Sequence, residues 1–454
     1  MNKLKVGYAE KKINPPLGVA ISGYYVARYG KGFIDDLYAQ AIAFEVDGNK
    51  SVIVIADALG IYRPLVNRCI AEISEKTGVP ASNIFIGATH THTGPLNTYP
   101  TCFPADENLV NENVEILFKG ITEAGIEALS NVKPAKMGYA VGHAPDRISY
   151  IRRYLMKDGS TFTCPPIDSP DIVKPLGELD RRVNVLRFDR EGAESIVMLN
   201  YGIHADTVNR DLYCSDWVGW TRKTVADTLD GAKCICIMGC QGDVGSTNVH
   251  PLPGDMNDTE ISFDNEMKSP GMARFVGRAL AGTILQVYDK VAYVDVDKLS
   301  IVNKTMTVNL NVPKEEDMPL ARKYKELYES GREDEIPYKA MQLTTVVAEA
   351  LRMCRMYGGP TTREMPMAGL KLGDVGMVFL PGEPFTDIGV NIKKAEGYGM
   401  IMPCALTNGY YGYFPSASAY KEGGYEARTS NYAPGIAEDM AEFNIGILNE
   451  LREK

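Results

Sequence analysis

Common catalytic signatures are absent from this chain of 454 residues. It contains no G-x-S-x-G nucleophile elbow, no G-x-x-x-x-G-K-[ST] phosphate loop and no G-x-G-x-x-G dinucleotide fingerprint. Each of these motifs builds the local turn on which its chemistry depends. Their absence disfavours a serine hydrolase of the elbow type, a P-loop nucleotidase and a classical dinucleotide enzyme.

Cysteine pairs suited to metal or disulfide chemistry are also missing. The nine cysteines are odd in number, and no two of them stand in a C-x-x-C spacing. Several lie in apolar strings such as KCICIMGC, where a small buried thiol fits well. We therefore expect free structural thiols and no cysteine-based zinc cluster.

Long apolar runs and a basic surface are lacking too. The formal net charge of −10 disfavours nucleic acid and anionic membranes as partners. The N-terminal string MNKLKVGYAEKKINPP has no apolar core of a secretory signal, and Arg274 and Arg278 interrupt the longest apolar helix pattern. We predict a cytoplasmic protein that acts on a small molecule, with no membrane span and with oligomer formation left open.

Short β-branched runs alternate with helical patterns along most of the chain. Residues 39–46 and 51–59 have the composition of strands, whereas residues 64–78 and 271–291 carry apolar side chains at helical spacing. Helical crossovers join parallel strands and tight hairpins join antiparallel ones, so the pattern predicts an α/β fold with mixed pairing. No linker is evident, and we expect a single large catalytic domain over residues 1–454.

Two of only five histidines stand one residue apart in the string GATHTHTGP, residues 87–95. If the preceding strand continues through His92, the side chains of His90 and His92 point to the same face. Ligands of α/β sheets bind beyond the carboxyl ends of strands, and neutral imidazole is the commonest metal ligand. The pair predicts a metal site at this strand end.

A third histidine, His204, stands at the exit of another apolar strand, in MLNYGIHADT. Glu383 likewise follows an apolar run, inside the turn of FLPGEPF. Two histidines and a carboxylate form a usual ligand set of hydrolytic zinc sites, which keep one position for water. His143 and His250 lie in loops without this context.

Other polar side chains are candidates for supporting roles. The string TNGYYGYFPSASAYKEGGYE holds five tyrosines, and a phenol can bind a metal or donate a hydrogen bond to an oxyanion. Asp57, Asp216 and Asp243 each follow an apolar strand. A carboxylate behind a ligand histidine orients the ring, so these aspartates are candidates for that role.

Taken in order, several strings resemble the catalytic domain of the neutral/alkaline non-lysosomal ceramidases and their shorter bacterial relatives. They are INPPLG, GATHTHTGP, NYGIHADT, CSDWVGW, QGDVGSTN, FLPGEPF and GYYGYFPSASAYKEGGYE. The resemblance spans about residues 6–442, and T-H-T-H-x-G-P is its most specific element. It implies two mixed β-sheets flanked by α-helices, one bound zinc ion and hydrolysis of an amide. We expect no counterpart of the family's C-terminal β-sandwich domain.

The resemblance also implies roles for individual side chains. By this resemblance the zinc ligands are His90, His204, Glu383 and Tyr413. The catalytic side chains beside the metal are His92 and Tyr425, and the substrate-binding ones are Arg147 and Ser246. Ser246 is shifted by one position, because the family's GDVSPN reads GDVGSTN here.

The predicted function is that of a zinc-dependent hydrolase that uses metal-activated water to cleave an amide (N-acyl) bond, as ceramidases do. Amides and esters pass through the same kind of tetrahedral oxyanion, so a metal-dependent esterase or lactonase acting on a small polar or sugar-derived compound is an alternative. A non-catalytic binding protein of the same fold is another. A deep apolar cavity at the metal would favour the N-acyl substrate, whereas a shallow one lined by Arg147 and other polar groups would favour a sugar-like one. Residues 98–109 are expected to line the entrance.

Overall fold

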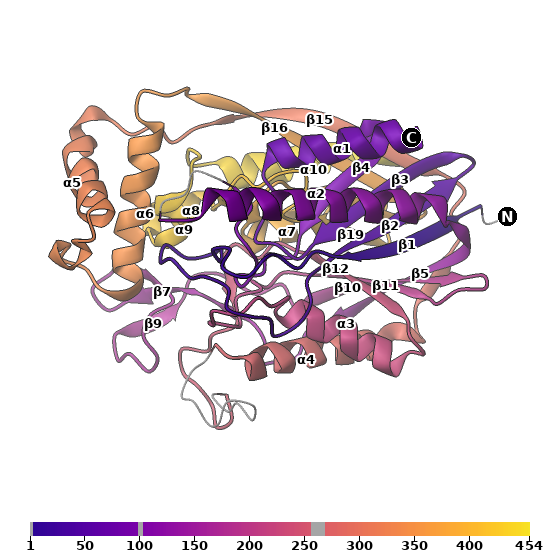
Figure 1. Cartoon of the computed structure of the whole chain (residues 1–454), viewed down its shortest axis with the longest axis horizontal. Helices are drawn as coiled ribbons and strands as arrows, with labels where there is room; N and C mark the ends of the chain where they lie inside the picture. The colour runs from indigo at the N-terminus through magenta and orange to yellow at the C-terminus, as the bar shows by residue number, and fades with distance from the viewer. Residues whose placement is uncertain (1–2, 99–102, 256–267) are drawn as a thin grey trace.

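The computed structural model describes residues 3–98, 103–255 and 268–454, and within them two mixed β-sheets are flanked by α-helices (Figure 1). The first sheet runs in the order β12-β11-β10-β5-β1-β2-β3-β4, and β14 pairs with β5. Its strands are β1 (Lys5–Lys12), β2 (Tyr38–Val46), β3 (Asn49–Ala56), β4 (Ile84–Ala88), β5 (Lys133–His143), β10 (Arg182–Arg190), β11 (Ile196–Tyr201), β12 (Lys233–Met238) and β14 (Ala292–Val294). The pairs β3–β4 and β11–β12 are parallel, and the other pairs are antiparallel.

The second sheet runs in the order β15-β16-β17-β19, and its β17–β19 pair is parallel. Its strands are β15 (Leu299–Asn309), β16 (Thr362–Leu372), β17 (Val375–Phe379) and β19 (Met400–Cys404). Short strands form smaller ladders: β6 (Tyr150–Ile151) with β13 (Val244–Gly245), β7 (Arg153–Met156) with β8 (Thr161–Thr163) and β9 (Ile172–Pro175), and β18 (Glu383–Pro384) with β20 (Tyr413–Phe414).

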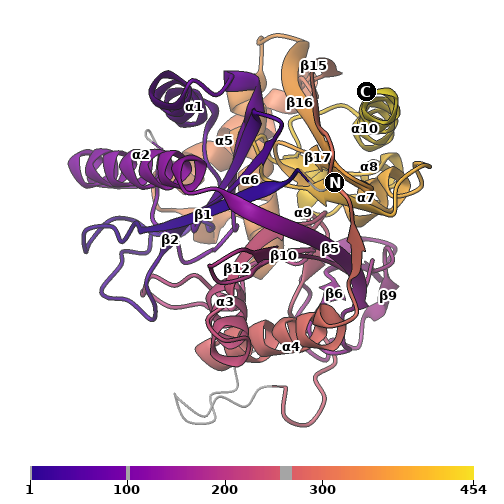
Figure 2. The same ribbon diagram turned by 90° about the vertical axis from the view of Figure 1, so that its right-hand side faces the viewer.

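Helices α1 (Arg63–Thr77), α2 (Glu107–Ser130), α3 (Trp217–Thr228) and α4 (Pro270–Tyr288) pack against the first sheet, and α7 (Thr386–Ile392) and α10 (Ile436–Glu453) pack against the second (Figure 2). The others, α5 (Met318–Glu329), α6 (Ala340–Met356), α8 (Ala417–Glu422) and α9 (Tyr425–Thr429), pack mainly on one another, on α10 and on the short strands β8 and β20. A helix is the crossover of each parallel pair of the two large sheets: α1 joins β3 to β4, α3 joins β11 to β12, and α7 joins β17 to β19. Each crossover helix buries its apolar face against its own sheet.

The inner faces of the two sheets share one apolar core. At its centre Phe85 of β4 stacks on Phe379 of β17, with ring centroids 4.0 Å apart. Both rings are buried; Phe85 lies three residues before the end of β4, and Phe379 is the last residue of β17. This contact therefore fixes the carboxyl ends of β4 and β17 relative to each other.

The segment after β19 joins the ends of the remaining strands. The Ala405 N–H donates to the carbonyl of Met238, the last residue of β12, at 2.8 Å. The Leu406 carbonyl accepts from the N–H of Ala88, the last residue of β4, at 3.2 Å. The edges of the first sheet therefore meet at the end of the second, and the carboxyl ends of the three parallel pairs of the large sheets lie around one point.

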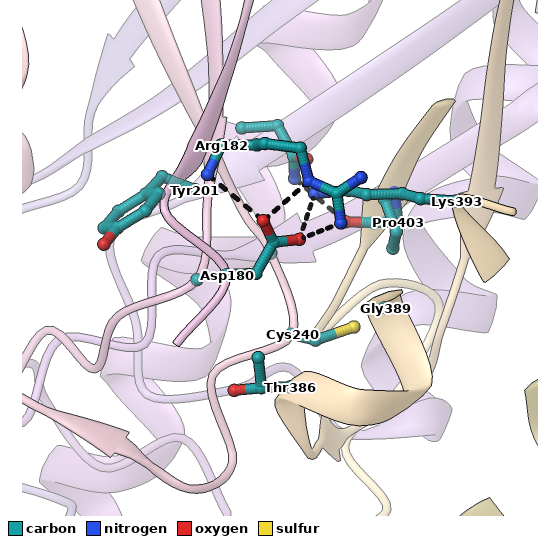
Figure 3. Close-up of a pocket in the computed structure, with 11 residues that line it drawn as sticks. Asp180, Arg182, Tyr201, Cys240, Thr386, Gly389, Lys393 and Pro403 are labelled. Carbon is teal, nitrogen blue, oxygen red and sulfur yellow. Dashed lines mark hydrogen bonds and ion pairs between the residues drawn. The ribbon is translucent and has the colours of Figure 1, made fainter. Parts of the chain in front are cut away.

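A buried ion network ties α7 to the first sheet (Figure 3). Asp180, just before β10, accepts from Arg182 Nε at 2.7 Å and from Lys393 Nζ, just after α7, at 2.9 Å. Burial alone raises the pKa of Asp180, but Arg182 and Lys393 outweigh burial and lower it to about 2. The small cavity at this network is lined by structural groups and holds none of the predicted site residues.

The structure confirms the predicted α/β class with two mixed sheets flanked by helices. The cysteines within the described residues are all free thiols, as expected. Over the same parts of the chain no helix is both long and apolar enough to cross a bilayer. The single catalytic domain, the cytoplasmic location and the oligomeric state stay predictions.

Candidate metal centre

His90 lies in the loop that follows β4. The strand ends at Ala88, so the prediction that it continues through His92 is wrong, and strand alternation does not bring the two rings together. Instead, His90 adopts a left-handed backbone with φ of 63°, an uncommon conformation that re-aims its side chain. Its Nδ1 lies 2.6 Å from the carbonyl oxygen of Leu59, and because a carbonyl oxygen only accepts, Nδ1 donates this hydrogen bond and Nε2 is left for another partner.

His204 follows β11 and is oriented in the same way. Its Nδ1 lies 2.9 Å from the carbonyl oxygens of both Gln241 and Val244. Burial, followed by the positive charge of Arg152, lowers the pKa of His204 to about 4, although Glu383 opposes the shift. At neutral pH the His204 ring is therefore uncharged, with the lone pair of Nε2 directed away from the carbonyls.

Glu383 follows β17 and is fully buried. Its Oε1 accepts a hydrogen bond from the phenol of Tyr410 at 2.7 Å. Its Oε2 lies 3.0 Å from Nε2 of His90 and 3.0 Å from Nε2 of His204. Burial raises the pKa of Glu383, but the neighbouring imidazoles, His90 first, lower it well below the ordinary value, so the carboxylate is ionised.

The same construction occurs at each of the three strand ends. In each of these strand pairs, the loop after one strand carries the side chain that points to the centre, and the loop after its partner strand carries the group that hydrogen-bonds it. His90 after β4 contacts the Leu59 carbonyl after β3, and His204 after β11 contacts the Gln241 carbonyl after β12. Glu383 after β17 accepts from Tyr410 after β19. Because neighbouring parallel strands end at one edge, ligand and support are brought together by the sheet itself.

Three atoms at the centre lack a partner. Nε2 of His90, Nε2 of His204 and Oε2 of Glu383 are buried and make no hydrogen bond. Buried polar atoms without partners are rare and costly, and here two imidazole nitrogens and one carboxylate oxygen face one another. Two donor atoms held by one tetrahedral zinc ion at about 2.1 Å stand about 3.4 Å apart, close to the 3.0 Å contacts found here. The donor set therefore fits a metal ion such as zinc.

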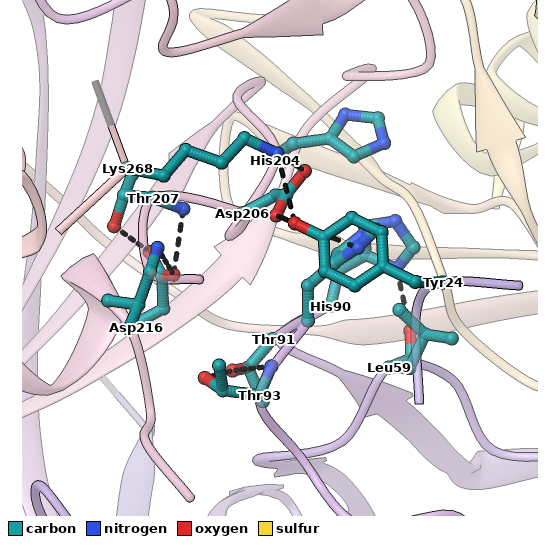
Figure 4. Close-up of polar contacts among 12 residues, drawn as sticks. Tyr24, Leu59, His90, Thr91, Thr93, His204, Asp206, Thr207, Asp216 and Lys268 are labelled. Atoms are coloured by element: carbon teal, nitrogen blue, oxygen red, sulfur yellow. Dashed lines mark hydrogen bonds and ion pairs between the residues drawn. The ribbon is translucent and has the colours of Figure 1, made fainter. Parts of the chain in front are cut away.

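His92 stands beside this centre, and its neighbour Asp206 belongs to a different network with Lys268 and Tyr24 (Figure 4). Its ring lies 4.9 Å from that of His90, and the nitrogens of His90, His92 and His204 fall within 4.8 Å of one another. Neither ring nitrogen of His92 has a hydrogen-bond partner, and Nδ1 lies 3.8 Å from Oδ1 of Asp206. Burial lowers the pKa of His92 well below its ordinary value. The ring is therefore neutral and free to accept a proton.

Asp206 is held ionised next to His92. It pairs with Lys268 and accepts a hydrogen bond from the phenol of Tyr24, and Lys268 Nζ donates to that phenol oxygen at 3.0 Å. Burial raises the pKa of Asp206, but the charge of Lys268 outweighs it and lowers the pKa far below the ordinary value. These residues were not predicted from the sequence, although Asp206 stands two positions after His204.

Tyr413 and Tyr425 lie on the opposite side of the centre. Tyr413 pairs with Glu383 in the β18–β20 ladder, and its ring centroid lies 5.7 Å from that of Tyr425. Its phenol oxygen accepts from Nη2 of Arg152 at 3.0 Å, and Arg152 Nε pairs with the buried Glu426 at 2.7 Å. The structure thus places Tyr413 next to Glu383, and its part as a fourth ligand stays a prediction.

Ser246 and Arg147, the two predicted substrate-binding residues, lie in different places. Ser246 lines a small cavity of about 20 Å³ together with His204, Arg152 and Lys268. Arg147 pairs with Asp255 through Nε at 2.9 Å and lines neither this cavity nor the large one described below. The arginine that reaches the site is Arg152, which sequence reasoning missed.

None of the three predicted aspartates touches a ligand imidazole, since backbone carbonyls hold both rings. Asp57 forms a buried pair with Arg222 at 2.7 Å. Asp216 caps α3 and accepts from Thr207, and Asp243 accepts from the N–H of Thr386 at 2.8 Å. Burial raises the pKa of both Asp216 and Asp243 to about 6. Asp216 and Asp243 hold the loops that carry His204 and the Gln241 and Val244 carbonyls, which accept from its ring. They therefore act on the position of the backbone and do not contact the imidazole itself.

A cavity of about 730 Å³ lies beside the centre; its lining includes none of His90, His92, His204 and Glu383. It is lined instead by residues that contact them, Leu59 and Tyr410, and by Tyr413, Tyr425, Gly23 and Tyr24. Its walls include aliphatic and aromatic side chains from several loops. Thr98 and Phe103 line it, as predicted for residues 98–109, of which residues 99–102 lie outside the described part of the chain.

Fold and site together define a mixed α/β protein with a buried cluster of histidines and a carboxylate that could hold a metal ion. The fold resembles that of solved ceramidases. A crystal structure of neutral ceramidase from Pseudomonas aeruginosa matches with a TM-score of 0.74 and 17% sequence identity, over 100% of this chain and 75% of that one. A ceramidase complexed with C2 matches with a TM-score of 0.73 and 17% identity, over 100% and 76% of the two chains. No family model and no curated protein matches the sequence. The predicted resemblance to neutral ceramidase is thus confirmed at the level of the fold.

Proposed function

We propose that this protein is a zinc-dependent hydrolase that cleaves an amide (N-acyl) bond. The observation that supports this proposal is the short distance between three buried atoms: Oε2 of Glu383 lies 3.0 Å from Nε2 of His90 and 3.0 Å from Nε2 of His204. None of the three atoms has a hydrogen-bond partner. Two buried imidazole nitrogens and one carboxylate oxygen that meet without hydrogen bonds favour a bound cation, and this donor set suits zinc. The likeness in fold to a neutral ceramidase supports an amide as the bond that is cleaved.

A zinc ion held by these residues lowers the pKa of a coordinated water and polarises a carbonyl oxygen. Proton transfer then falls to His92, whose ring is buried and neutral and has two unpartnered nitrogens. It accepts a proton from the attacking water and returns it to the departing nitrogen. Asp206, 3.8 Å from Nδ1, stabilises the imidazolium that forms in between.

Two groups on the other side act on the oxygen that gains negative charge. Tyr425 presents a phenol at the cavity, beside the ring of Tyr413. The guanidinium of Arg152 stands behind Tyr413 and donates to its phenol oxygen. Donors fixed in a water-poor site stabilise a developing oxyanion strongly. Of the two predicted substrate-binding side chains, we keep Ser246 and replace Arg147 with Arg152.

The shape of the cavity favours an N-acyl substrate over a sugar-derived lactone. A volume of about 730 Å³ with aromatic and aliphatic walls accommodates an acyl group of some length. The polar lining expected for the sugar-like alternative consisted of Arg147, Asp and Asn groups: Arg147 lies elsewhere and no Asp is among the described lining residues, whereas Asn97 and Asn431 do line the cavity.

The proposal is tested by metal replacement and a substrate panel. Chelator-treated protein should lose hydrolysis of N-acyl amides, and added zinc should restore it, with esters and lactones of matched size cleaved far more slowly. His204→Ala should lose both zinc and activity, whereas the control His250→Ala, at an exposed histidine, should keep both. Preferred turnover of esters or lactones would instead establish the esterase alternative. Stoichiometric zinc without turnover of any member would establish a binding protein.

A further inference from the structure

The large cavity has two chemically different parts. The part next to the histidine cluster is lined by the phenols of Tyr410, Tyr413 and Tyr425. The other part, called the arginine end here, is formed by α6 and the start of β16 and carries three arginines: Arg352, Arg355 and Arg363. The lining also includes the apolar side chains of Tyr62, Leu96, Phe103, Leu310 and Leu351. Figure 1 shows α6 beside α9, so the helix that carries two of the arginines stands next to the segment that carries Tyr425.

Arg352 is an unusual residue for a cavity wall. It is only 5% exposed, and its Nε is buried without a hydrogen-bond partner. Its Nη1 donates to the carbonyl of Asn311 at 2.8 Å, which fixes the guanidinium but leaves it uncompensated by an acid. Burial lowers the pKa of Arg352; Glu349 opposes the shift, and the charge of Arg355 adds to it. A buried guanidinium with a spare donor is a costly arrangement in the absence of an anion.

The other two arginines surround the same end of the cavity. Arg355 is one turn along α6 from Arg352 and donates to Oδ1 of Asn431 at 2.9 Å. Arg363 lies with its guanidinium carbon 5.8 Å from the centre of the Tyr411 ring. Both are held by neutral partners, so their charges are available to a ligand.

No acidic side chain lines the described part of this cavity, although the protein as a whole is acidic. The protein carries a net charge of −10, yet among the described residues that line this cavity none is Asp or Glu. The nearest acid on α6, Glu349, is already paired with Arg428 through Nε at 2.9 Å. Three guanidinium groups at one end of a cavity therefore form a local positive site on an acidic protein.

We propose that this arginine end binds an anionic group of the substrate, a carboxylate or a phosphate. The inference rests on the proposed amide hydrolysis and names the substrate class: an amide with an apolar acyl portion that ends in an anion. Guanidinium groups bind both anions through paired N–H donors, and the apolar side chains of the lining contact the acyl chain.

The test uses p-nitroanilides of a graded series of acyl chain lengths, each made with a methyl, a carboxylate or a phosphate terminus. At the best length, the anionic members should exceed the methyl member in kcat/KM by at least about tenfold, mainly through a lower KM. Arg363→Gln should reduce that preference by about tenfold while the methyl substrate changes less than about twofold. Arg278→Gln, on the exposed surface of α4, is the matched control and should leave the preference intact.

A binding measurement separates this inference from the proposed function. Titration calorimetry of the metal-free protein with the free diacid of the preferred length should show binding that Arg352→Gln and Arg363→Gln weaken and that added salt weakens further. Equal kcat/KM for methyl and anionic members, or a preference that survives both substitutions, would overturn the inference while amide hydrolysis stands. If the diacid binds through the arginines and no anilide is cleaved by the zinc-loaded protein, the anion site stands and the proposed function fails.

Discussion

The substitution Glu383→Gln distinguishes a metal site from a buried ion pair by the sign of its effect. In the metal-free protein, Oε2 of Glu383 faces two imidazole nitrogens at 3.0 Å, and the neutral His204 offers it a lone pair instead of a proton. A carboxamide can donate a hydrogen bond to that nitrogen. The free energy of unfolding of the metal-free variant should therefore equal that of the parent or exceed it by up to about 3 kcal/mol.

Zinc should reverse the order of the two proteins. At a free concentration a thousandfold above its dissociation constant, a bound ion stabilises the parent by about 4 kcal/mol, and Glu383→Gln should lose most of that gain. The assay is urea denaturation with chelator and with zinc, and His250→Ala controls for binding to other histidines and to unfolded chains. If Glu383 served only as the partner of a charged histidine, the metal-free variant would be less stable by about 3–5 kcal/mol, and this result would refute the reasoning.

Other side chains give predictions that can be measured in the same way. Tyr410→Phe removes the donor to Oε1 of the buried carboxylate, so zinc affinity, measured by competition with a chelator, should fall about tenfold to a hundredfold with the fold retained; unchanged affinity would argue against this support. Gly23→Ala forces a Cβ to within 2.6 Å of Nδ1 of His92 at a φ of +107°, so kcat should fall while the zinc content stays at the parent value; joint loss of both would show that the loop holds the metal site as well. Asp180→Asn removes a carboxylate whose folded pKa, about 2, lies below its unfolded value, so above pH ~4 the variant should be less stable by about 2 kcal/mol. That difference should shrink as the pH falls from ~4 towards ~2, and a difference independent of pH in denaturation curves would contradict the assignment.

The sequence identified the candidate ligand side chains because each one follows a strand end, and their role as ligands stays a prediction. His90, His204 and Glu383 come just after apolar, β-branched runs, and polar groups in such places lie at the carboxyl edge of a sheet. The strand pattern was also sufficient for the α/β class. The same pattern does not indicate β16, an eleven-residue strand that pairs along its full length with β15, because Pro366 and mixed polarity interrupt its apolar alternation.

The supporting groups could not be predicted in the same way. Both ligand imidazoles are held by backbone carbonyls, such as that of Leu59, and any residue has a carbonyl. Arg152 and Lys268 reach the site from loops whose course depends on tertiary packing, and nothing in their local sequence distinguishes them from surface cations. The string APDRISYIRRY contains several arginines, and only the coordinates show that Arg152 faces the cluster.

The most direct test of the metal centre is anomalous X-ray diffraction at the zinc absorption edge from crystals grown with zinc. The account predicts one strong peak within about 2.0–2.2 Å of Nε2 of His90, Nε2 of His204 and a carboxylate oxygen of Glu383. An absence of anomalous density at that point, with a hydrogen-bonded water or a direct N–H···O contact joining the three side chains, would contradict it.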